Sequence, residues 1–224
     1  MPRQLSLHPS AFLLMAQILQ LILFALVENL HSQRALISAF SVLILVLVVW
    51  VINHSPGVNW PAWLLAAPCF GLTIFSAFVN DPALVIWSSL LEAILYFYAA
   101  GSLIAYMMED DRVTPDELFG LAATFTLLAW GFAYLYLVCQ TLIPGSFVSG
   151  LILERDPNFL EFLSLSFTNL TATGLGDITP YSSWARILVM LEQFVGIGYV
   201  ATVVSRLIGM TLQKKGSKRA KGII

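Results

Sequence analysis

Long apolar stretches alternate with short polar ones along the chain, which is the pattern of a protein that crosses a membrane several times. A membrane-spanning helix needs about 20 mostly apolar residues. Stretches of this kind cover six ranges, 11–27, 35–52, 61–79, 83–108, 118–142 and 185–212. The pattern predicts an all-α membrane protein with six transmembrane helices.

A shorter apolar stretch, residues 159–170, lies between the last two spans. Its 12 residues reach only about 18 Å as a helix, which is too short to cross a bilayer. Asn158 and Glu161 have the spacing of a capping box, so we expect a helix to begin there. Two interpretations stay open: a re-entrant helix that stops at mid-membrane, or a buried interfacial helix followed by a chance Gly-x-Gly turn.

The acidic segment 109–117 is the sharpest change of composition, and it divides the chain in two. Thr114, Pro115 and the acids after them have the order of an N-cap, a first helical residue and a first turn. We expect a four-helix bundle over 1–113 and a second module over 114–224. The second module consists of an outer helix 118–142, the short helix 159–170, an inner helix 185–212 and a basic tail. The acidic segment is either a solvated loop with a helix cap or a sensor of divalent cations or pH.

Composition excludes an ordinary soluble domain, because 58% of residues are hydrophobic, 11% are charged and the mean hydropathy is +0.84. Cys69 and Cys139 fall inside apolar stretches, and the histidines have no metal-motif spacing. No nucleophile and base pair is visible among the polar residues of the spans. We therefore expect neither an enzyme nor a cofactor or nucleic-acid binder.

The positive charges predict the orientation in the membrane. With the N-terminus inside, the cytoplasmic side carries Arg3, Arg112, Arg206 and the five basic residues of the tail, against Arg34, Arg155 and Arg186 outside. The excess favours cytoplasmic N- and C-termini in the plasma (cell inner) membrane. The basic tail lies against anionic lipid in this orientation, although a regulatory partner is the alternative.

One motif carries most of the chemistry. Residues 171–177 read Thr-Ala-Thr-Gly-Leu-Gly-Asp, followed by Ile-Thr-Pro. The segment resembles the signature Thr-Thr-Val-Gly-Tyr-Gly-Asp of the tetrameric potassium channels. In those channels, backbone carbonyls from four chains replace the hydration shell of the ion. The resemblance implies a homotetramer, with potassium as the permeant ion. The residues that it assigns to the filter are Thr171, Ala172, Thr173, Gly174, Leu175, Gly176 and Asp177.

Within that segment the resemblance gives each position a role. The carbonyls of Ala172, Thr173, Gly174 and Leu175 would hold K⁺. Gly174 and Gly176 would supply the permissive backbone, and Asp177 an acidic ring outside.

Three positions depart from the family signature. Ala172 lacks the hydroxyl that completes the innermost ion site of the family. Leu175 lacks the tyrosine hydroxyl that ties the filter sideways, so we expect packing instead of hydrogen bonds to hold the filter wall. Thr173 replaces valine, and its hydroxyl is expected to bond behind the filter to groups such as Thr168 or to water. A weakly selective K⁺/Na⁺ channel is therefore the alternative to a potassium channel.

The last span fits an inner helix that lines an ion pathway. Gly196 and Gly198 are either a hinge or sites of close helix packing. With Gly196 at the hinge, helical spacing turns four apolar residues toward the axis, where they could block ions by expelling water. These pore-lining and gate residues are Ile197, Val200, Val204 and Ile208.

Charged groups inside the spans complete the predictions. Glu192 either supports the filter by bonding to Thr168 or Asn169, or makes an ordinary hydrogen bond between helices. The fourth span, 83–108, contains no lysine or arginine, so steep voltage gating from this helix is not expected. A secondary transporter remains a weaker alternative, because transporters usually show paired helix interruptions and this chain shows one.

Overall fold

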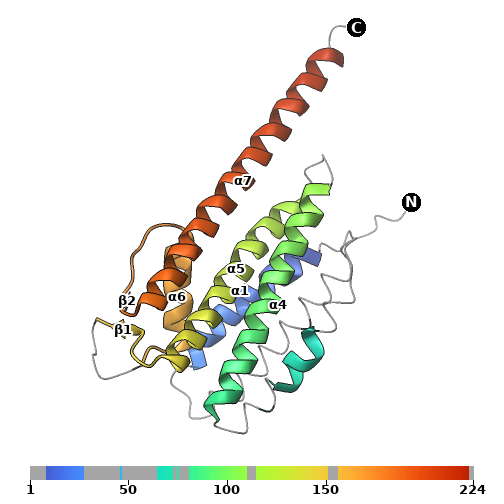
Figure 1. Ribbon diagram of the computed structural model, residues 1–224. Coiled ribbons are helices and arrows are strands. Elements are labelled where there is room, and N and C mark those ends of the chain that lie inside the picture. The colour runs from blue at the N-terminus through green and yellow to red at the C-terminus, as the bar shows by residue number, and fades with distance from the viewer. Residues whose placement is uncertain are drawn as a thin grey trace.

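The computed structural model describes residues 9–27, 46, 65–72, 75, 81–109, 115–150 and 156–221. The described part is mostly helical (Figure 1). Three of its helices are long and apolar enough to cross a membrane, within Pro82–Met108, Asp116–Leu142 and Ser183–Ile208. The chain is therefore a membrane protein. Of the expected spans 35–52 and 61–79, only residues 46, 65–72 and 75 are described, and they are helical.

Helix α5 (Pro115–Leu142) is the central element. It packs against α1 (Pro9–Val27), α4 (Pro82–Glu109), α6 (Phe159–Leu170) and α7 (Ser183–Lys221). Proline is its first residue, and Asp116 and Glu117 occupy its first turn, where negative charges interact favourably with the helix dipole. The first-turn acids predicted from sequence are confirmed, whereas Thr114 lies outside the described residues.

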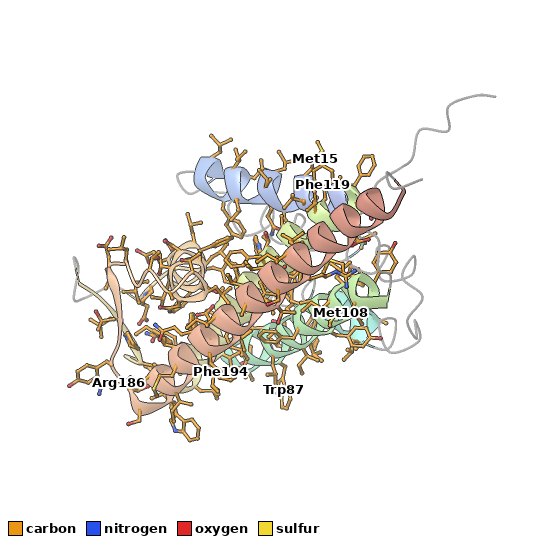
Figure 2. All side chains as sticks on the ribbon, turned by 90° about the horizontal axis from the view of Figure 1, so that it is seen from above. Met15, Trp87, Met108, Phe119, Arg186 and Phe194 are labelled. Carbon is orange, nitrogen blue, oxygen red and sulfur yellow. The ribbon has the colours of Figure 1, made fainter. Side chains whose placement is uncertain are left out.

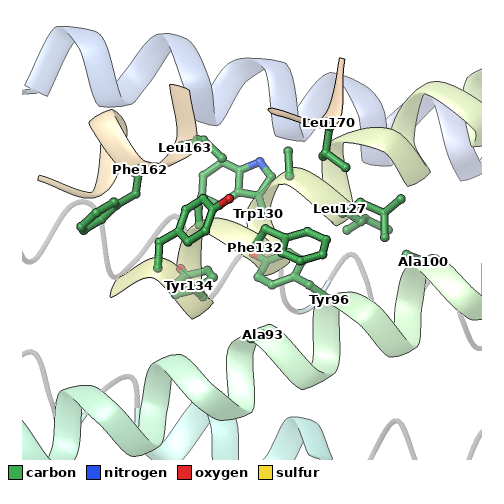
Figure 3. Packing of buried hydrophobic residues seen from close by; sticks show 14 of the residues in the cluster. Ala93, Tyr96, Ala100, Leu127, Trp130, Phe132, Tyr134, Phe162, Leu163 and Leu170 are labelled. Atoms are coloured by element: carbon green, nitrogen blue, oxygen red, sulfur yellow. The ribbon is translucent and has the colours of Figure 1, made fainter. Parts of the chain in front are cut away.

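Aromatic side chains fill the core between α1, α4, α5 and α6. Trp130 of α5 lies 5.6 Å from the rings of Phe24 and Phe159 and 6.2 Å from that of Tyr96. Figure 3 shows Trp130 and Tyr96 of this core together with Tyr134 of α5 and Phe162 of α6. Tilted and offset ring pairs at such distances add to the free energy gained from apolar packing. The cluster fixes α6 against the other helices.

Two short strands lie at one end of the helices, while the C-terminal part of α7 extends past the other end (Figure 1). β1 (Phe147–Ser149) pairs antiparallel with β2 (Ile178–Pro180), and Val148 faces Thr179. Ser182 accepts a hydrogen bond from the backbone N–H of Ala185 and so caps α7. The β pair therefore joins the loop after α5 to the chain just before α7.

Helix α7 is the least covered of the three long helices. Only 11% of its apolar span is buried within the chain, against 72% for that of α5. Large apolar side chains point away from the helices on several sides of the molecule, including Met15, Trp87 and Phe194 (Figure 2). Exposed apolar faces of this extent fit a surrounding of lipid or of further chains.

Candidate functional site

The short helix α6 has the bounds that the sequence predicts, Phe159–Leu170. Its capping box is confirmed: the Asn158 side chain accepts from the backbone N–H of Glu161 at 2.9 Å, and the Glu161 carboxylate accepts from the backbone N–H of Asn158 at 2.7 Å. These bonds satisfy N–H groups that a helix start otherwise leaves open. The helix is fixed at its first turn and ends in the interior of the molecule.

Residues 171–177, called the filter segment below, fold back from the end of α6. The backbone N–H groups of Thr173 and Gly174 both donate to the carbonyl of Thr168, at 2.9 and 3.2 Å. The hydroxyls of Thr171 and Thr173 donate to the same carbonyl at 3.1 Å, and they lie 3.0 Å from each other. The predicted bond from Thr173 toward Thr168 is therefore present, with the backbone oxygen as acceptor. The last carbonyls of α6 thus hold the start of the filter segment.

Left-handed backbone conformations occur at two positions of the filter segment, Gly174 at φ 64° and Ala172 at φ 55°. Gly176 does not have a positive φ, so the expectation that both glycines supply the permissive backbone is correct for Gly174 alone. A Cβ at Gly176 would meet the side chains of Leu165 and Thr168 at 3.8 and 3.9 Å. An alanine in the left-handed region costs about 1–2 kcal/mol, so Ala172 is a strained residue.

The strain at Ala172 leads to a prediction about stability. Glycine adopts positive φ without a steric penalty, so Ala172→Gly should stabilise the filter segment by about 1 kcal/mol per chain. We expect the midpoint of thermal denaturation of the purified protein to rise, as measured by the soluble fraction in size-exclusion chromatography after heating. A lower midpoint would show that the contacts of the alanine methyl group stabilise the protein by more than the left-handed backbone destabilises it.

Hydrogen bonds also hold the outer end of the filter segment. The backbone N–H of Gly150 donates to the carbonyl of Asp177 at 2.7 Å, next to the β1–β2 pair. A Cβ at Gly150 would lie 3.3 Å from that oxygen, so glycine permits the close approach. Hydrogen bonds therefore hold both ends of the filter segment, whereas the predicted packing of the filter wall concerns Leu175. Leu175, in the middle, has 75% of its side chain exposed within one chain.

The loop that carries β1 is anchored in turn to the end of α5. Gln140 donates through its side-chain amide to Asp156 at 2.6 Å and accepts from the backbone N–H of Phe147 at 2.9 Å. Ser146 accepts through its carbonyl from the backbone N–H of Tyr181 at 2.8 Å. Both sides of the filter segment are thus connected to the central helix.

Glu192 of α7 is fully buried and joins three helices. Its carboxylate accepts hydrogen bonds from the hydroxyl of Tyr136 on α5 and from that of Ser166 on α6. The amide of Asn169 donates to Tyr136 at 3.2 Å and also bonds to Glu192. Asn169 is therefore one of the predicted partners, whereas the Thr168 hydroxyl bonds to the Leu165 carbonyl at 2.9 Å instead. The network lies directly beside the last turn of α6.

Gly196 contacts the end of α6 through its backbone. A Cβ at this position would overlap the carbonyl oxygen of Leu170 and would lie 2.8 and 2.9 Å from its Cα and carbonyl carbon. Leu170 directly precedes the filter segment. Of the two interpretations of Gly196, close packing is the one that the structure shows. A Cβ at Gly198, in contrast, would meet nothing within 4 Å.

The four expected pore-lining residues share one stripe of α7. Successive helical residues are rotated by about 100°, so these four positions project from one side of α7. That side begins near Gly196 and is turned away from Glu192. All four are exposed within one chain. They are Ile197, Val200, Val204 and Ile208.

The acidic residues at the start of α5 take part in contacts between helices. Asp116 accepts from the backbone N–H and the hydroxyl of Ser10 on α1, at 3.3 and 3.1 Å. Glu117 is buried and lies 3.4 Å from the guanidinium of Arg206 on α7. The described residues contain no group of three or more possible metal ligands. The side chains of Glu109, Asp110 and Asp111 lie outside the described part.

Several of these residues were missed from the sequence alone. Tyr136, Ser166 and Gln140 are polar residues inside or at the end of apolar helices, and that was the signal available. Residues 122–213 match the family model described as an ion channel. The match covers most of α5, all of α6 and the filter segment, and α7 as far as Gln213, just before its basic part. Comparisons with curated proteins and with solved structures gave no match.

The ion-channel match and the membrane-spanning helices support a membrane-embedded ion channel. They also favour a function other than an enzyme. The filter segment, the glutamate network and the Gly196 contact all lie within the matched residues.

Proposed function

We propose that four copies of this chain form a passive, potassium-conducting channel, with the filter segments around a common axis. The observation that supports this most strongly is the arrangement of α6 and residues 171–177. The short helix ends at the buried Leu170, and the chain then continues as an exposed segment whose first residues hydrogen-bond back to the carbonyl of Thr168. Within one chain every residue of the filter segment is exposed. Four such segments can offer carbonyl oxygens of Ala172, Thr173, Gly174 and Leu175 to a cation.

The tetramer also accounts for the exposed surface of α7. In a closed cyclic assembly every chain buries the same surfaces against its neighbours. The stripe from Ile197 to Ile208 would face the central axis and line the ion pathway. The proposed orientation places the termini in the cytoplasm of a cell whose plasma (inner) membrane holds the channel.

A weakly selective monovalent cation channel is the second candidate. Ala172 has no hydroxyl to offer an inner ion site, and Leu175 has no hydroxyl that could hydrogen-bond the filter to the helices around it. Reversal potentials of the purified channel in planar bilayers, with K⁺ on one side and Na⁺ on the other, decide between the two. A reversal potential near zero would exclude potassium selectivity. An absence of uncoupled flux from liposomes would exclude a channel and favour the transporter alternative.

We expect conduction to depend only weakly on voltage through α4. Each elementary charge that crosses the membrane field contributes about 2.3 kcal/mol per 100 mV, and α4 contains no lysine or arginine. Open probability between −100 and +100 mV, recorded from single channels, should change far less than in a channel with several gating charges. A steep conductance–voltage curve would place the sensor elsewhere in the chain.

The apolar stripe of α7 is proposed to close the pathway by excluding water. Ile208→Ser places a hydroxyl in the constriction and should raise the open probability without a stimulus. The measurement is basal single-channel current of the variant and of the unmodified protein at equal protein density. An unchanged open probability would argue against a gate at Ile208.

A further inference from the structure

A cavity of about 220 Å³ lies between α4, α5 and α7. Its walls are mostly apolar side chains from the three helices. They include Ile104 and Met107 of α4, Leu121 and Leu128 of α5, and Val195 of α7. Because α5 packs against both other helices, it forms the floor of the cavity. The cavity is independent of the filter segment and of the glutamate network.

Polar groups on the wall are bonded to the protein itself. The hydroxyl of Tyr199 donates to the carbonyl of Leu121 at 2.5 Å, and that of Thr202 donates to the carbonyl of Gly198 at 2.8 Å. A cavity with such walls does not hold ordered water. All three helices contain spans long enough to cross a bilayer, so in a membrane lipid hydrocarbon surrounds these helices wherever no further chain covers them. An acyl chain therefore suits the cavity better than water.

One end of the cavity is charged. Arg206 lines it and pairs with Glu117 at 3.4 Å. A guanidinium has five N–H donors in a fork, so it can hold a carboxylate and a phosphate together. Helix α7 continues to Lys221, and Lys214 and Lys215 follow Arg206 by about 12–14 Å along its axis. Basic residues near the membrane surface attract the phosphates of anionic lipids.

We propose that the cavity binds one acyl chain of a membrane phospholipid whose phosphate lies at Arg206. The lipid would fill the space between α4 and α7 and would be in direct contact with the inner helix. The proposal rests on the membrane location of these helices and does not require that the protein conducts ions. Lipid binding and ion conduction can therefore fail separately.

The experiment uses the full chain reconstituted in bilayers of phosphatidylglycerol and phosphatidylcholine in equal parts. The protein is then extracted in mild detergent, and retained phospholipid is counted by native mass spectrometry. Ile104→Trp fills the cavity from α4. Ala105→Trp is the matched control, because Ala105 is the next residue of the same helix, does not line the cavity and is exposed.

We expect Ile104→Trp to lower the retained phospholipid at least about tenfold, which corresponds to roughly 1.4 kcal/mol of binding free energy. Ala105→Trp should retain as much lipid as the unmodified protein. Arg206→Gln should also lower retention, because it removes the guanidinium. Gly198→Phe fills the cavity from α7 and replaces Ile104→Trp if that variant does not fold.

Two results would overturn the proposal. One is an unmodified protein free of phospholipid, as expected if a neighbouring chain fills the cavity. The other is equal retention by the filled variants and the control, which would place the lipid elsewhere on the surface. Ion flux measured on the same samples reports on conduction alone, so a lipid-free but conducting protein would refute this inference and leave the channel intact.

Discussion

Gly196→Ala is expected to lower ion flux at least about tenfold and to weaken the proposed tetramer. The added methyl group would overlap the backbone of Leu170, which cannot rotate away as a flexible side chain can. Overpacking of this kind costs about 1–3 kcal/mol per site. In the proposed tetramer the four sites together would lose about 4–12 kcal/mol if their effects add.

The consequence reaches the filter segment because Leu170 directly precedes Thr171. Separation of α7 from α6 would move the carbonyl of Thr168, on which several donors of the filter segment converge. The measurements are potassium flux into liposomes and the fraction of tetramer by size-exclusion chromatography. We expect flux to fall at least about tenfold, as an energetic change above 1.4 kcal/mol requires.

Gly101→Ala is the matched control. Gly101 lies in α4, and a Cβ there would meet nothing within 4 Å. Alanine is a better helix former than glycine by about 1 kcal/mol, so this variant should assemble and conduct as the unmodified protein does. A hinge role would give a different result: Gly196→Ala and Gly198→Ala would both reduce flux while the tetramer stayed intact. That outcome would contradict the packing interpretation.

Features that depend on neighbours in the sequence could be predicted, as the short helix shows. The capping box at Asn158 and the length of the apolar stretch determine where α6 begins and ends. The end of α7 was predicted at residue 212, where the apolar pattern stops, but the helix continues to Lys221. Lysine and arginine are good helix formers, so loss of hydrophobicity marked the end of the apolar span and not the end of the helix.

Features that depend on distant residues could not be predicted in the same way. The sequence indicates that Glu192 needs a partner, but Tyr136 is 56 residues away and Ser166 is 26 residues away. The choice among polar residues depends on how three helices rotate against one another. The backbone of Ala172 is a similar case. Its left-handed conformation follows from the hydrogen bonds to α6, whereas local preference predicts such a conformation only at glycine.

Glu192→Leu is expected to abolish conduction, whereas Glu192→Gln should be tolerated. Leucine removes the carboxylate that accepts from two buried hydroxyls. Ser166 can still donate to the carbonyl of Ala129 at 2.8 Å, but Tyr136 loses its acceptor. A buried donor without a partner costs about 1–3 kcal/mol. Because Asn169 belongs to the same network and lies in the last turn of α6, the loss should also loosen the attachment of the filter segment.

Glutamine can keep the network because hydroxyls both donate and accept. Its carbonyl oxygen can accept from Tyr136, and its amide can donate to Ser166. The Ser166 hydroxyl then donates to the backbone carbonyl of Ala129, which lies 2.8 Å away. We therefore expect Glu192→Gln to retain flux within about threefold of the unmodified protein, a change below 1 kcal/mol.

Tyr136→Phe separates the role of the network from that of the acid alone. It removes one donor to Glu192 and the acceptor of the Asn169 amide, at almost the same side-chain volume. Flux and tetramer stability of this variant should lie between those of Glu192→Gln and Glu192→Leu. If Glu192→Gln lost conduction as completely as Glu192→Leu, the negative charge itself would be required, and hydrogen bonding would not explain why α7 carries a buried acid beside α6.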